Sequence, residues 1–421
     1  MTGPAPARVL LLDHTAKLSG GEQALLGVAS ALHGGAATAR AIVFEDGPLV
    51  GRLRALGIDT ALLPLGSDLN TTSRSRALSP KGLLRGAGAL AGFVPRLARS
   101  IRFSGAELVV ANSLKSAVFA SLAAPLARRP WVWHLHDRLA ADYLPRPLAA
   151  AMRLLATWGP RAIVVNSSAT AATLPRRARA KATIAYPGLM PDAFAPAPAQ
   201  ESASVVGLIG RISPTKGQRE FLNAAALIAA EHPAVRFRVV GAALFGEDEY
   251  EAEVRALPDQ LGIGDRVEFT GWVADPGAQL RELTVLVHAS PVPEPFGQVV
   301  VEAMAAGVPV IGAAAGGVPE ILGADDETGT AGTETAAAGI RHTPYGVLVR
   351  PGDPNALARA LSDVLNDPAG RQARAAAARR RARESFTIER TAAACLGAWG
   401  RALGSVRNPR PMGVRGVTVP R

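Results

Sequence analysis

Two glutamates, Glu294 and Glu302, stand eight positions apart in the segment PEPFGQVVVEAMAAGVPVI, which covers residues 293–311. An apolar run precedes this segment, turn residues open it, and an Ala/Val/Met-rich helical stretch ends at Gly307. Open α/β sheets bind ligands where a strand passes into a helix, because free backbone N–H groups and the helix dipole meet there. We therefore expect Glu294 on a loop and Glu302 in the first turns of a helix, facing one ligand from different sides.

Two cations occupy a similar strand-to-helix junction in the segment GLIGRISPTKGQREFL. Gly210 and Arg211 come first, and Lys216 and Gly217 follow after a short turn. A planar guanidinium and a compact ammonium on two sides of a turn suit a diphosphate, which they could neutralise without a metal ion. A solvated pair of loop residues would explain the two cations equally well.

A glycine turn follows the first apolar run of the chain, at Ser19–Glu22. Gly20 and Gly21 would let the backbone approach a ligand closely, and the start of a helix there favours negative charge. The turn matches neither the dinucleotide GxGxxG pattern nor the phosphate-loop GxxxxGK[ST] pattern. An ordinary turn between a strand and a helix is the alternative interpretation.

Two histidines, His134 and His136, end another apolar run. Their i, i+2 spacing places both on one face of a strand, where they could ligate a metal. The sequence offers no third cluster of ligands, so we predict no metal site. We expect instead a polar strand end that lines a cleft, where His136 would bond a sugar hydroxyl or the reacting oxygens.

Short apolar runs alternate with helical segments along the whole chain, which predicts parallel sheets covered by helices on both faces. Its 421 residues suit two domains of about 200 residues each. The expected strands are 8–12, 41–44, 108–111, 131–134 and 162–165, then 205–209, 237–240, 267–269, 285–288, 308–311 and 347–349. The expected helices include 21–32, 79–102, 354–366, 369–385 and 388–403. A Pro/Ala-rich linker, 195–202, separates the two sets.

The positive charge of the chain lies in its first half. The net charge is +11, and residues 1–195 hold 23 Lys and Arg against 10 Asp and Glu. This imbalance indicates an anionic partner such as a membrane surface, or a merely solvated basic face. The segment Ser79–Arg102 has an apolar stripe beside basic residues, typical of a membrane-surface helix or of a sheet-covering helix kinked or broken at Pro95.

The sequence predicts a cytoplasmic protein. It has no apolar run of about 20 residues that could span a membrane, and its first residues lack a signal pattern. The single cysteine, Cys395, excludes an internal disulfide.

Taken together, GRISPTKG, EPFGQVVVEAMAAGVPVI, GGVPEI, the SGGE turn and the HD strand end resemble the retaining glycosyltransferases of family 4. The resemblance covers nearly the whole chain and implies a GT-B fold, in which two Rossmann-like doubly wound domains face a central cleft. It implies an acceptor-binding domain at 1–195, a nucleotide-sugar-binding domain at 203–387, a C-terminal helix at 388–403 that packs back on the first domain, and a disordered tail at 404–421.

The resemblance also assigns roles to the residues above. Glu294 would contact donor-sugar hydroxyls without acting as a nucleophile, and Glu302 would hold the nucleotide ribose. Arg211 and Lys216 would bind the diphosphate beside Gly210. The remaining matches are the backbone of Phe296, Gly297 and Gln298 at the sugar and phosphates, Gly20 and Gly21 at the diphosphate and acceptor, and His136 at the reacting centre.

The expected activity is thus retaining, metal-independent transfer from a nucleotide-diphosphate sugar, without a cofactor, to a glycan, lipid-linked or small-molecule acceptor. Such transfer serves glycan, glycolipid or cell-envelope polysaccharide synthesis, and the basic half adds a prediction of peripheral contact with the inner face of the cell membrane. No nucleic-acid partner is expected. Three alternatives remain: a non-catalytic GT-B binding protein, a sugar phosphorylase and a nucleotide-sugar epimerase.

One segment departs from the family pattern. An acidic, Gly/Thr-rich stretch lies between Glu320 and Gly346, where the family has a short connection, and it predicts an inserted mobile loop.

Overall fold

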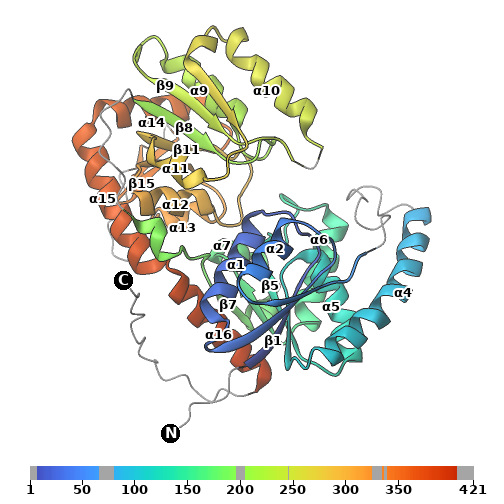
Figure 1. The fold of residues 1–421 in the computed structure, drawn as a ribbon. Helices are drawn as coiled ribbons and strands as arrows, with labels where there is room; N and C mark the ends of the chain where they lie inside the picture. The colour runs from blue at the N-terminus through green and yellow to red at the C-terminus, as the bar shows by residue number, and fades with distance from the viewer. Residues whose placement is uncertain are drawn as a thin grey trace.

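The protein contains two sheets, one in each half of the chain, with helices on both faces of each (Figure 1); the first is parallel and the second is parallel except at one edge. The computed structural model describes residues 7–65, 80–195, 204–244, 246–324, 334–335 and 339–404. The predicted linker and tail fall outside the described residues, apart from Ala195 and Gly404.

The first sheet has the strand order β3-β2-β1-β4-β5-β6-β7, and every neighbouring pair is parallel. Its strands are β1 (Ala7–Asp13), β2 (Ala37–Val43), β3 (Asp59–Leu62), β4 (Leu108–Ala111), β5 (Trp131–Leu135), β6 (Ala162–Val165) and β7 (Ala182–Ile184). Alternate residues of a strand point to opposite faces, so Leu10 and Leu12 join one buried core while Val9 and Leu11 join the other. Burial on both faces explains the continuous apolar runs.

The helices of this half are α1 (Gly20–Leu32), α2 (Pro48–Ala55), α4 (Pro80–Phe103), α5 (Leu114–Leu126), α6 (Arg146–Trp158), α7 (Ser168–Ala172) and α8 (Arg176–Arg179), followed by the 3-10 helix η2 (Pro191–Phe194). Helix α4 continues through Pro95, so the break that was one of the expectations for this proline is absent. The described part of its apolar stripe, Val94, Leu97 and Ile101, is buried in the core. This part of the stripe therefore covers the sheet, and for these residues the membrane-surface interpretation is wrong.

The second sheet repeats this strand order as β10-β9-β8-β11-β12-β15 and adds β14 and β13 at one edge. Its strands are β8 (Val205–Ile209), β9 (Arg236–Val240), β10 (Val267–Gly271), β11 (Val285–His288), β12 (Val310–Ala313), β13 (Glu334–Thr335), β14 (Ile340–Thr343) and β15 (Gly346–Val349). Strand β14 pairs antiparallel with β15, so the predicted inserted loop is wrong at its end, which forms sheet. Residues 325–333 and 336–338 of that loop lie outside the described residues.

The helices of the second half are α9 (Gln218–Ile228), α10 (Asp248–Gln260), α11 (Pro276–Arg281), α12 (Gln298–Ala306), α13 (Val318–Ile321) and α14 (Pro354–Asn366), with the 3-10 turn η3 (Gly264–Arg266). One core lies between the sheet and α9, α10 and α14, and the other lies beneath α12, α13 and α15 (Pro368–Ser385).

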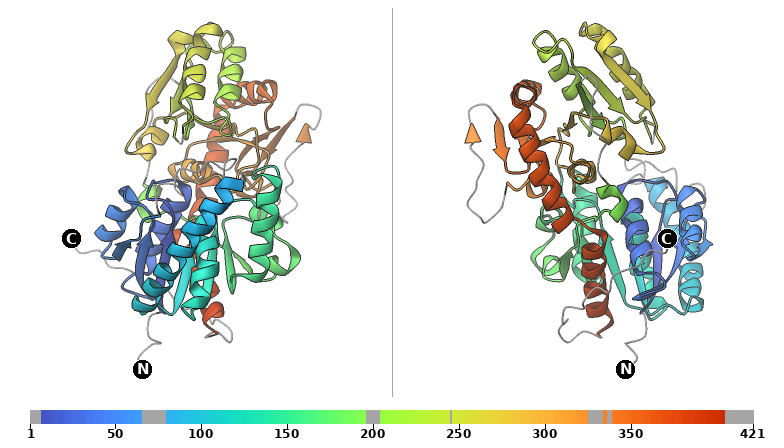
Figure 2. Two further views of the ribbon diagram at one scale, coloured as in Figure 1. Left: turned by 90° about the vertical axis from the view of Figure 1, so that its right-hand side faces the viewer. Right: turned by 60° about the vertical axis from the view of Figure 1, so that its left-hand side comes forward.

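Two consecutive helices, α15 (Pro368–Ser385) and α16 (Ile388–Leu403), run along the side of both domains (Figures 1 and 2). Ala378 and Ala382 of α15 are buried in the second domain. Cys395, Ala398 and Trp399 of α16 are buried against the first sheet, in the core that also contains Leu11. The chain thus returns to the first domain after completing the second.

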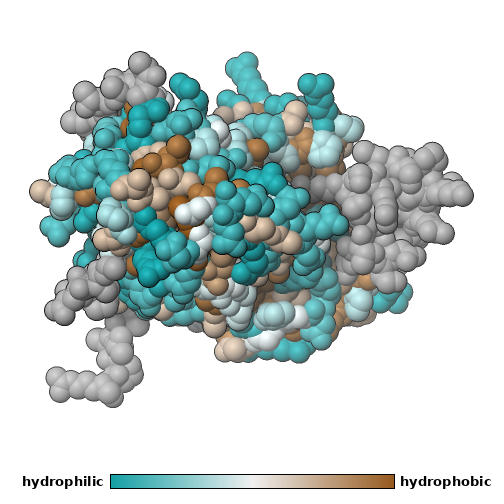
Figure 3. All heavy atoms as spheres, turned by 90° about the horizontal axis from the view of Figure 1, so that it is seen from above, coloured by the Kyte–Doolittle hydropathy of each residue, from teal (hydrophilic) through white to brown (hydrophobic). Residues whose placement is uncertain are grey.

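In both sheets the chain runs outward in opposite directions from the first strand, so the topological switch point lies between β1 and β4 and between β8 and β11. Ligands of doubly wound folds bind beyond the carboxyl ends of the strands at such points. The face seen from above the second domain is mainly hydrophilic, with smaller hydrophobic areas between the polar side chains (Figure 3). No helix among the described residues has the length and apolar character needed to cross a bilayer.

Candidate active site

Glu294 lies on the loop between β11 and α12, and a second loop holds it in place. The backbone N–H of Gly317 donates to the carbonyl of Glu294 at 2.9 Å, and Glu294 forms a parallel bridge with Gly316. A methyl group at Gly316 would lie only 1.9 Å from the Glu294 carbonyl oxygen. The GGVPE turn therefore needs its glycines because the two backbones are in contact.

The carboxylate of Glu294 has a partner on each oxygen. Lys216 Nζ lies 2.5 Å from Oε1, while His288 Nε2 lies 2.8 Å and Ser290 Oγ 3.1 Å from Oε2. Burial alone would raise the pKa of Glu294, but the charge of Lys216 and the hydrogen bond from His288 hold that pKa well below its ordinary value. Glu294 is thus an ionised carboxylate held in one orientation.

Lys216 reaches Glu294 because the turn before α9 packs directly on the end of β11. Gly217, the N-cap of α9, has φ +80°, and a methyl group there would lie 2.1 Å from the carbonyl oxygen of Ala289. Only glycine fits this position without strain. The predicted cation and the predicted carboxylate, 78 residues apart in sequence, are therefore neighbours at the switch point.

Arg211, the second predicted cation, follows Gly210 at the end of β8. Its Nη1 lies 2.6 Å from Glu247 Oε2 at the start of α10, and its carbonyl accepts a hydrogen bond from Gln218 Nε2 at 2.9 Å. Each cation is thus paired with a carboxylate, Arg211 with Glu247 and Lys216 with Glu294.

Glu302 is placed differently, in the second turn of α12. Its Oε1 accepts one hydrogen bond from Gln298 Nε2 at 3.1 Å, and burial raises the pKa of its carboxyl. Phe296 is 4% exposed and packs on Tyr186 and Phe386, so only its backbone can meet a ligand. Gly297 follows with φ 110° and begins the helix as its N-cap.

The first domain faces this site with its own helix N-terminus. Helix α1 begins at Gly20, and a methyl group there would lie 3.6 Å from Gln298 Oε1. A methyl group at Gly21 would lie 3.3 Å from the ring of His136. The N-termini of α1 and α12 therefore meet across the domain boundary, and both favour an anion.

His136 is oriented by a buried polar network at the ends of β1, β4 and β5. Its Nε2 lies 2.9 Å from Asn112 Oδ1, and Asn112 Nδ2 donates to Asp13 Oδ2 at 2.7 Å. Burial lowers the pKa of His136, against the opposing charges of Asp137 and Asp13. The imidazole is therefore neutral near pH 7.

His134, on the same strand, is not part of this network. It is 3% exposed, stacks on Trp399 of α16, and accepts a hydrogen bond from its indole Nε1 at 3.1 Å. Within the described ranges no group of three or more His, Cys, Asp or Glu side chains is placed to hold a metal ion.

Sequence comparison identifies the family. The model for Glycosyltransferase Family 4 matches residues 49–192, and the model for Glycosyl transferases group 1 matches residues 191–381. The 2-deoxystreptamine glucosyltransferase of Streptomyces kanamyceticus is 30% identical over 325 residues, which cover 70% of this chain and 77% of that enzyme. The chain belongs to glycosyltransferase family 4.

Other relatives agree with this assignment. The D-inositol 3-phosphate glycosyltransferase of Stackebrandtia nassauensis is 31% identical to this glycosyltransferase over 314 residues, or 67% of the chain. The match spans 66% of the length of that relative, and 56% and 47% of the corresponding Streptomyces scabiei and Streptomyces avermitilis enzymes.

Solved structures confirm the predicted GT-B fold of this glycosyltransferase. HepE of Anabaena, crystallised with UDP and glucose, superposes with a TM-score of 0.76 at 26% identity and covers 93% of this chain and 99% of its own. Sucrose-phosphate synthase of Thermosynechococcus elongatus shares the fold, with a TM-score of 0.71 at 22% identity, over 95% of this chain and 99% of its own.

Sequence reasoning missed three side chains that support the site: His288, Asn112 and Asp13. Each stands at the carboxyl end of a strand, and each is buried. A polar residue that ends an apolar run was the available signal. The sequence did not show which residue each of these side chains pairs with, since hydrogen-bonded partners such as Asn112 and Asp13 are 99 residues apart.

Proposed function

We propose that this glycosyltransferase moves a sugar from a nucleoside-diphosphate sugar to an acceptor hydroxyl, with retention at the anomeric carbon and without a metal ion. The observation that carries the proposal is the 2.5 Å contact between Lys216 and Glu294. In this proposal the cation that would bind the diphosphate lies directly beside the carboxylate that would bind the sugar, opposite the N-terminus of α1.

The donor would lie across the start of α12. The diphosphate would sit between Lys216, Arg211 and the N-terminus of α12, with the ribose diol on Glu302, because a carboxylate accepts two hydroxyl hydrogen bonds at once. Preorganised cations and N–H groups stabilise the charge that develops on the leaving diphosphate. Two protein cations at this point supply the charge that a divalent metal provides elsewhere.

Glu294 would orient the sugar and not attack it. Retention through a covalent intermediate needs a free carboxylate near the anomeric carbon. Both oxygens of Glu294 are engaged by Lys216 and His288, and its lowered pKa makes it a weak nucleophile. The leaving phosphate oxygen would instead assist deprotonation of the acceptor on the same face, with neutral His136 beside the reacting oxygens.

UDP-glucose is the first donor to test, because HepE of Anabaena was crystallised with it and is 26% identical to this chain over 95% of its length. Acceptor candidates include 2-deoxystreptamine and D-inositol 3-phosphate, which are named for two relatives, and also lipid-linked glycans. A thermal-shift panel of UDP, GDP, ADP and their sugars would identify the donor, since a ligand at 100 times its Kd stabilises by about 3 kcal/mol.

The decisive variants are Glu294→Ala and Lys216→Ala. Both should abolish transfer while the circular dichroism spectrum stays unchanged. Glu249→Ala, an exposed glutamate on α10, is the matched control and should keep full activity. Near-normal turnover of either site variant would overturn the site assignment.

We also propose that the protein acts in the cytoplasm and associates peripherally with the inner face of the cell membrane. The support is the charge of the first half, 23 basic against 10 acidic residues. Co-sedimentation with anionic vesicles should fall steeply with salt, and no binding at low salt would refute it.

A further inference from the structure

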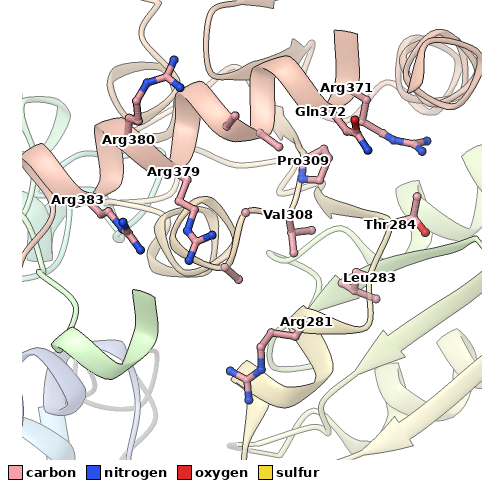
Figure 4. A pocket seen from close by; sticks show the side chains of 14 residues that line it. Arg281, Leu283, Thr284, Val308, Pro309, Arg371, Gln372, Arg379, Arg380 and Arg383 are labelled. Atoms are coloured by element: carbon pink, nitrogen blue, oxygen red, sulfur yellow. The ribbon is translucent and has the colours of Figure 1, made fainter. Parts of the chain in front are cut away.

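A cavity of about 480 Å³ lies in the second domain, between α15, the end of α12 and α11 (Figure 4). Its charged lining residues are all arginines, and no aspartate or glutamate lines it. They are Arg281, Arg371, Arg379, Arg380 and Arg383. In Figure 4, Arg379 and Arg383 extend from α15 on one side, while Arg371 reaches toward Thr284 on the other.

This cavity is separate from the donor site. Its lining includes Leu283 and Thr284, which precede β11, and Val308 and Pro309, which precede β12. It therefore lies at the amino ends of these strands, whereas the Glu294 loop follows the carboxyl end of β11. None of the residues proposed to bind the donor lines it.

Two arginines that line the cavity, Arg371 and Arg379, have only partial compensation of their polar groups. Burial lowers the pKa of Arg371, and nearby Asp367 offsets this only in part. The Nε atom of Arg379 is buried without a hydrogen-bond partner. Partly buried arginines such as these two gain free energy when an anion enters, because it replaces the hydration that partial burial removed.

We propose that this cavity binds a ligand presenting several phosphate groups. Guanidinium groups pair with phosphate in a bidentate manner, and the cavity has the size of a small-molecule site. The ligand would be either a soluble phosphorylated molecule or the headgroups of an anionic lipid surface. The proposal does not depend on the identity of the sugar donor.

Occupancy would also affect the connection between the domains. Arg379 Nη2 and Arg383 Nη2 donate to the carbonyl of Phe194, at 2.8 and 3.0 Å. Phe194 ends η2, just before the chain enters the second domain. A bound phosphate would compete with this carbonyl for the same two guanidinium groups.

The test is calorimetric titration of the full chain with inorganic tripolyphosphate. We expect Arg371→Ala to weaken binding by about tenfold, since a charge-assisted pair with the anion is lost. Arg374→Ala is the matched control: it removes the same charge from the same helix, but Arg374 does not line the cavity. A double variant, Arg371→Ala with Arg383→Ala, should weaken binding further, and thermal unfolding checks that each variant is folded.

Repeating the titration with Lys216→Ala protein separates this cavity from the proposed donor site, because cavity binding should survive that substitution. Sedimentation with phosphatidylglycerol vesicles distinguishes a soluble phosphorylated ligand from the headgroups of a lipid surface. Loss of vesicle binding in Arg371→Ala assigns the cavity to lipid headgroups, and loss of tripolyphosphate binding alone assigns it to a soluble ligand. Equal affinities of Arg371→Ala and Arg374→Ala for both probes, or no binding by the unaltered protein, would overturn the proposal.

Discussion

The carboxylate of Glu320, in the second domain, caps the start of α7 in the first domain by accepting the backbone N–H of Ser168 at 3.0 Å. The same carboxylate accepts the hydroxyl of Ser168, the N–H of Ala169 at 3.2 Å and the hydroxyl of Tyr186 at 3.0 Å. Nearby, Ser167 Oγ donates to the carbonyl of Pro295 at 2.5 Å, in the loop that carries Glu294. These contacts therefore hold the two domains together beside the proposed donor site.

Removing this carboxylate should loosen the domain contact. Glu320→Ala leaves the N–H groups of Ser168 and Ala169 to water, so we expect a loss of about 1–2 kcal/mol in the free energy of unfolding. Small-angle X-ray scattering should show a larger radius of gyration. Tyr186→Phe removes one of the four donors and should have a smaller effect. An unchanged scattering profile in Glu320→Ala would refute this role.

A second prediction concerns the loss of stability in acid at the contact between α16 and the first domain. Burial lowers the pKa of His134 from 6.5 to about 3, and the ring accepts the Trp399 hydrogen bond through Nε2. Between these pH values the unfolded chain binds a proton that the folded chain does not. Stability should therefore be complete above pH 6.5 and should fall on acidification, by up to about 1.4 kcal/mol per pH unit.

Urea unfolding at pH 7 and pH 5 measures this loss. His134→Gln cannot titrate and should show a smaller difference between the two pH values. His136→Gln is the comparison, since the pKa of His136 is also lowered by burial but its ring contacts Asn112 instead of Trp399. If His134→Gln keeps the full pH dependence, His134 is not its source.

The sequence was sufficient to predict most of the sheet strands, because buried parallel strands such as Leu108–Ala111 are continuous apolar runs. The sequence was insufficient to predict the strands at the edges of the two sheets. Strands β3 and β7 are short and only partly buried, so they lack such a run, and β14 reads IRHT. Strand β12 begins at Val310, two residues later than predicted.

The site was predictable where spacing and glycines carried the signal. Lys216 and Glu294 could be named from their strand-to-helix junctions, and the structure brings them into contact. The pairing of Arg211 with Glu247 and the hold of Glu320 on Ser168 could not be foreseen. These contacts depend on where loops meet in space, which local sequence does not encode.

The third prediction separates stability from ligand binding at Glu302. Burial raises the pKa of its carboxyl, so the folded state is penalised for holding the ionised form as pH rises through that pKa. Glu302→Gln removes the charge and should leave the unliganded protein equally or more stable at pH 7. If Glu302 holds the ribose as proposed, the affinity for UDP should fall by about tenfold to a hundredfold.

Thermal unfolding with and without UDP measures both effects at once. A lower melting temperature without ligand, combined with an undiminished shift on adding UDP, would contradict both parts. Glu282→Gln, an exposed glutamate paired with Arg238, is the control and should change neither.

The last prediction concerns a residue that would not touch substrate. Gly316 has φ +67°, and a methyl group there would overlap the backbone of Glu294, at 1.9 Å from its carbonyl oxygen and 2.6 Å from its nitrogen. Gly316→Ala must therefore displace the Glu294 loop, although it substitutes none of the polar residues of the site. A displacement of about 1 Å at a positioning group can cost about a hundredfold in rate.

Gly262→Ala is the matched control, because Gly262 has φ +72° and no atom within 4 Å of the added methyl group. It carries the left-handed backbone cost of about 1–2 kcal/mol but no collision. Gly316→Ala should lose more stability than Gly262→Ala, because it adds a collision to the same backbone cost, and only Gly316→Ala should lose transfer. Equal turnover in the two would mean that the Glu294 loop tolerates displacement, so that the position of its carboxylate does not limit the rate.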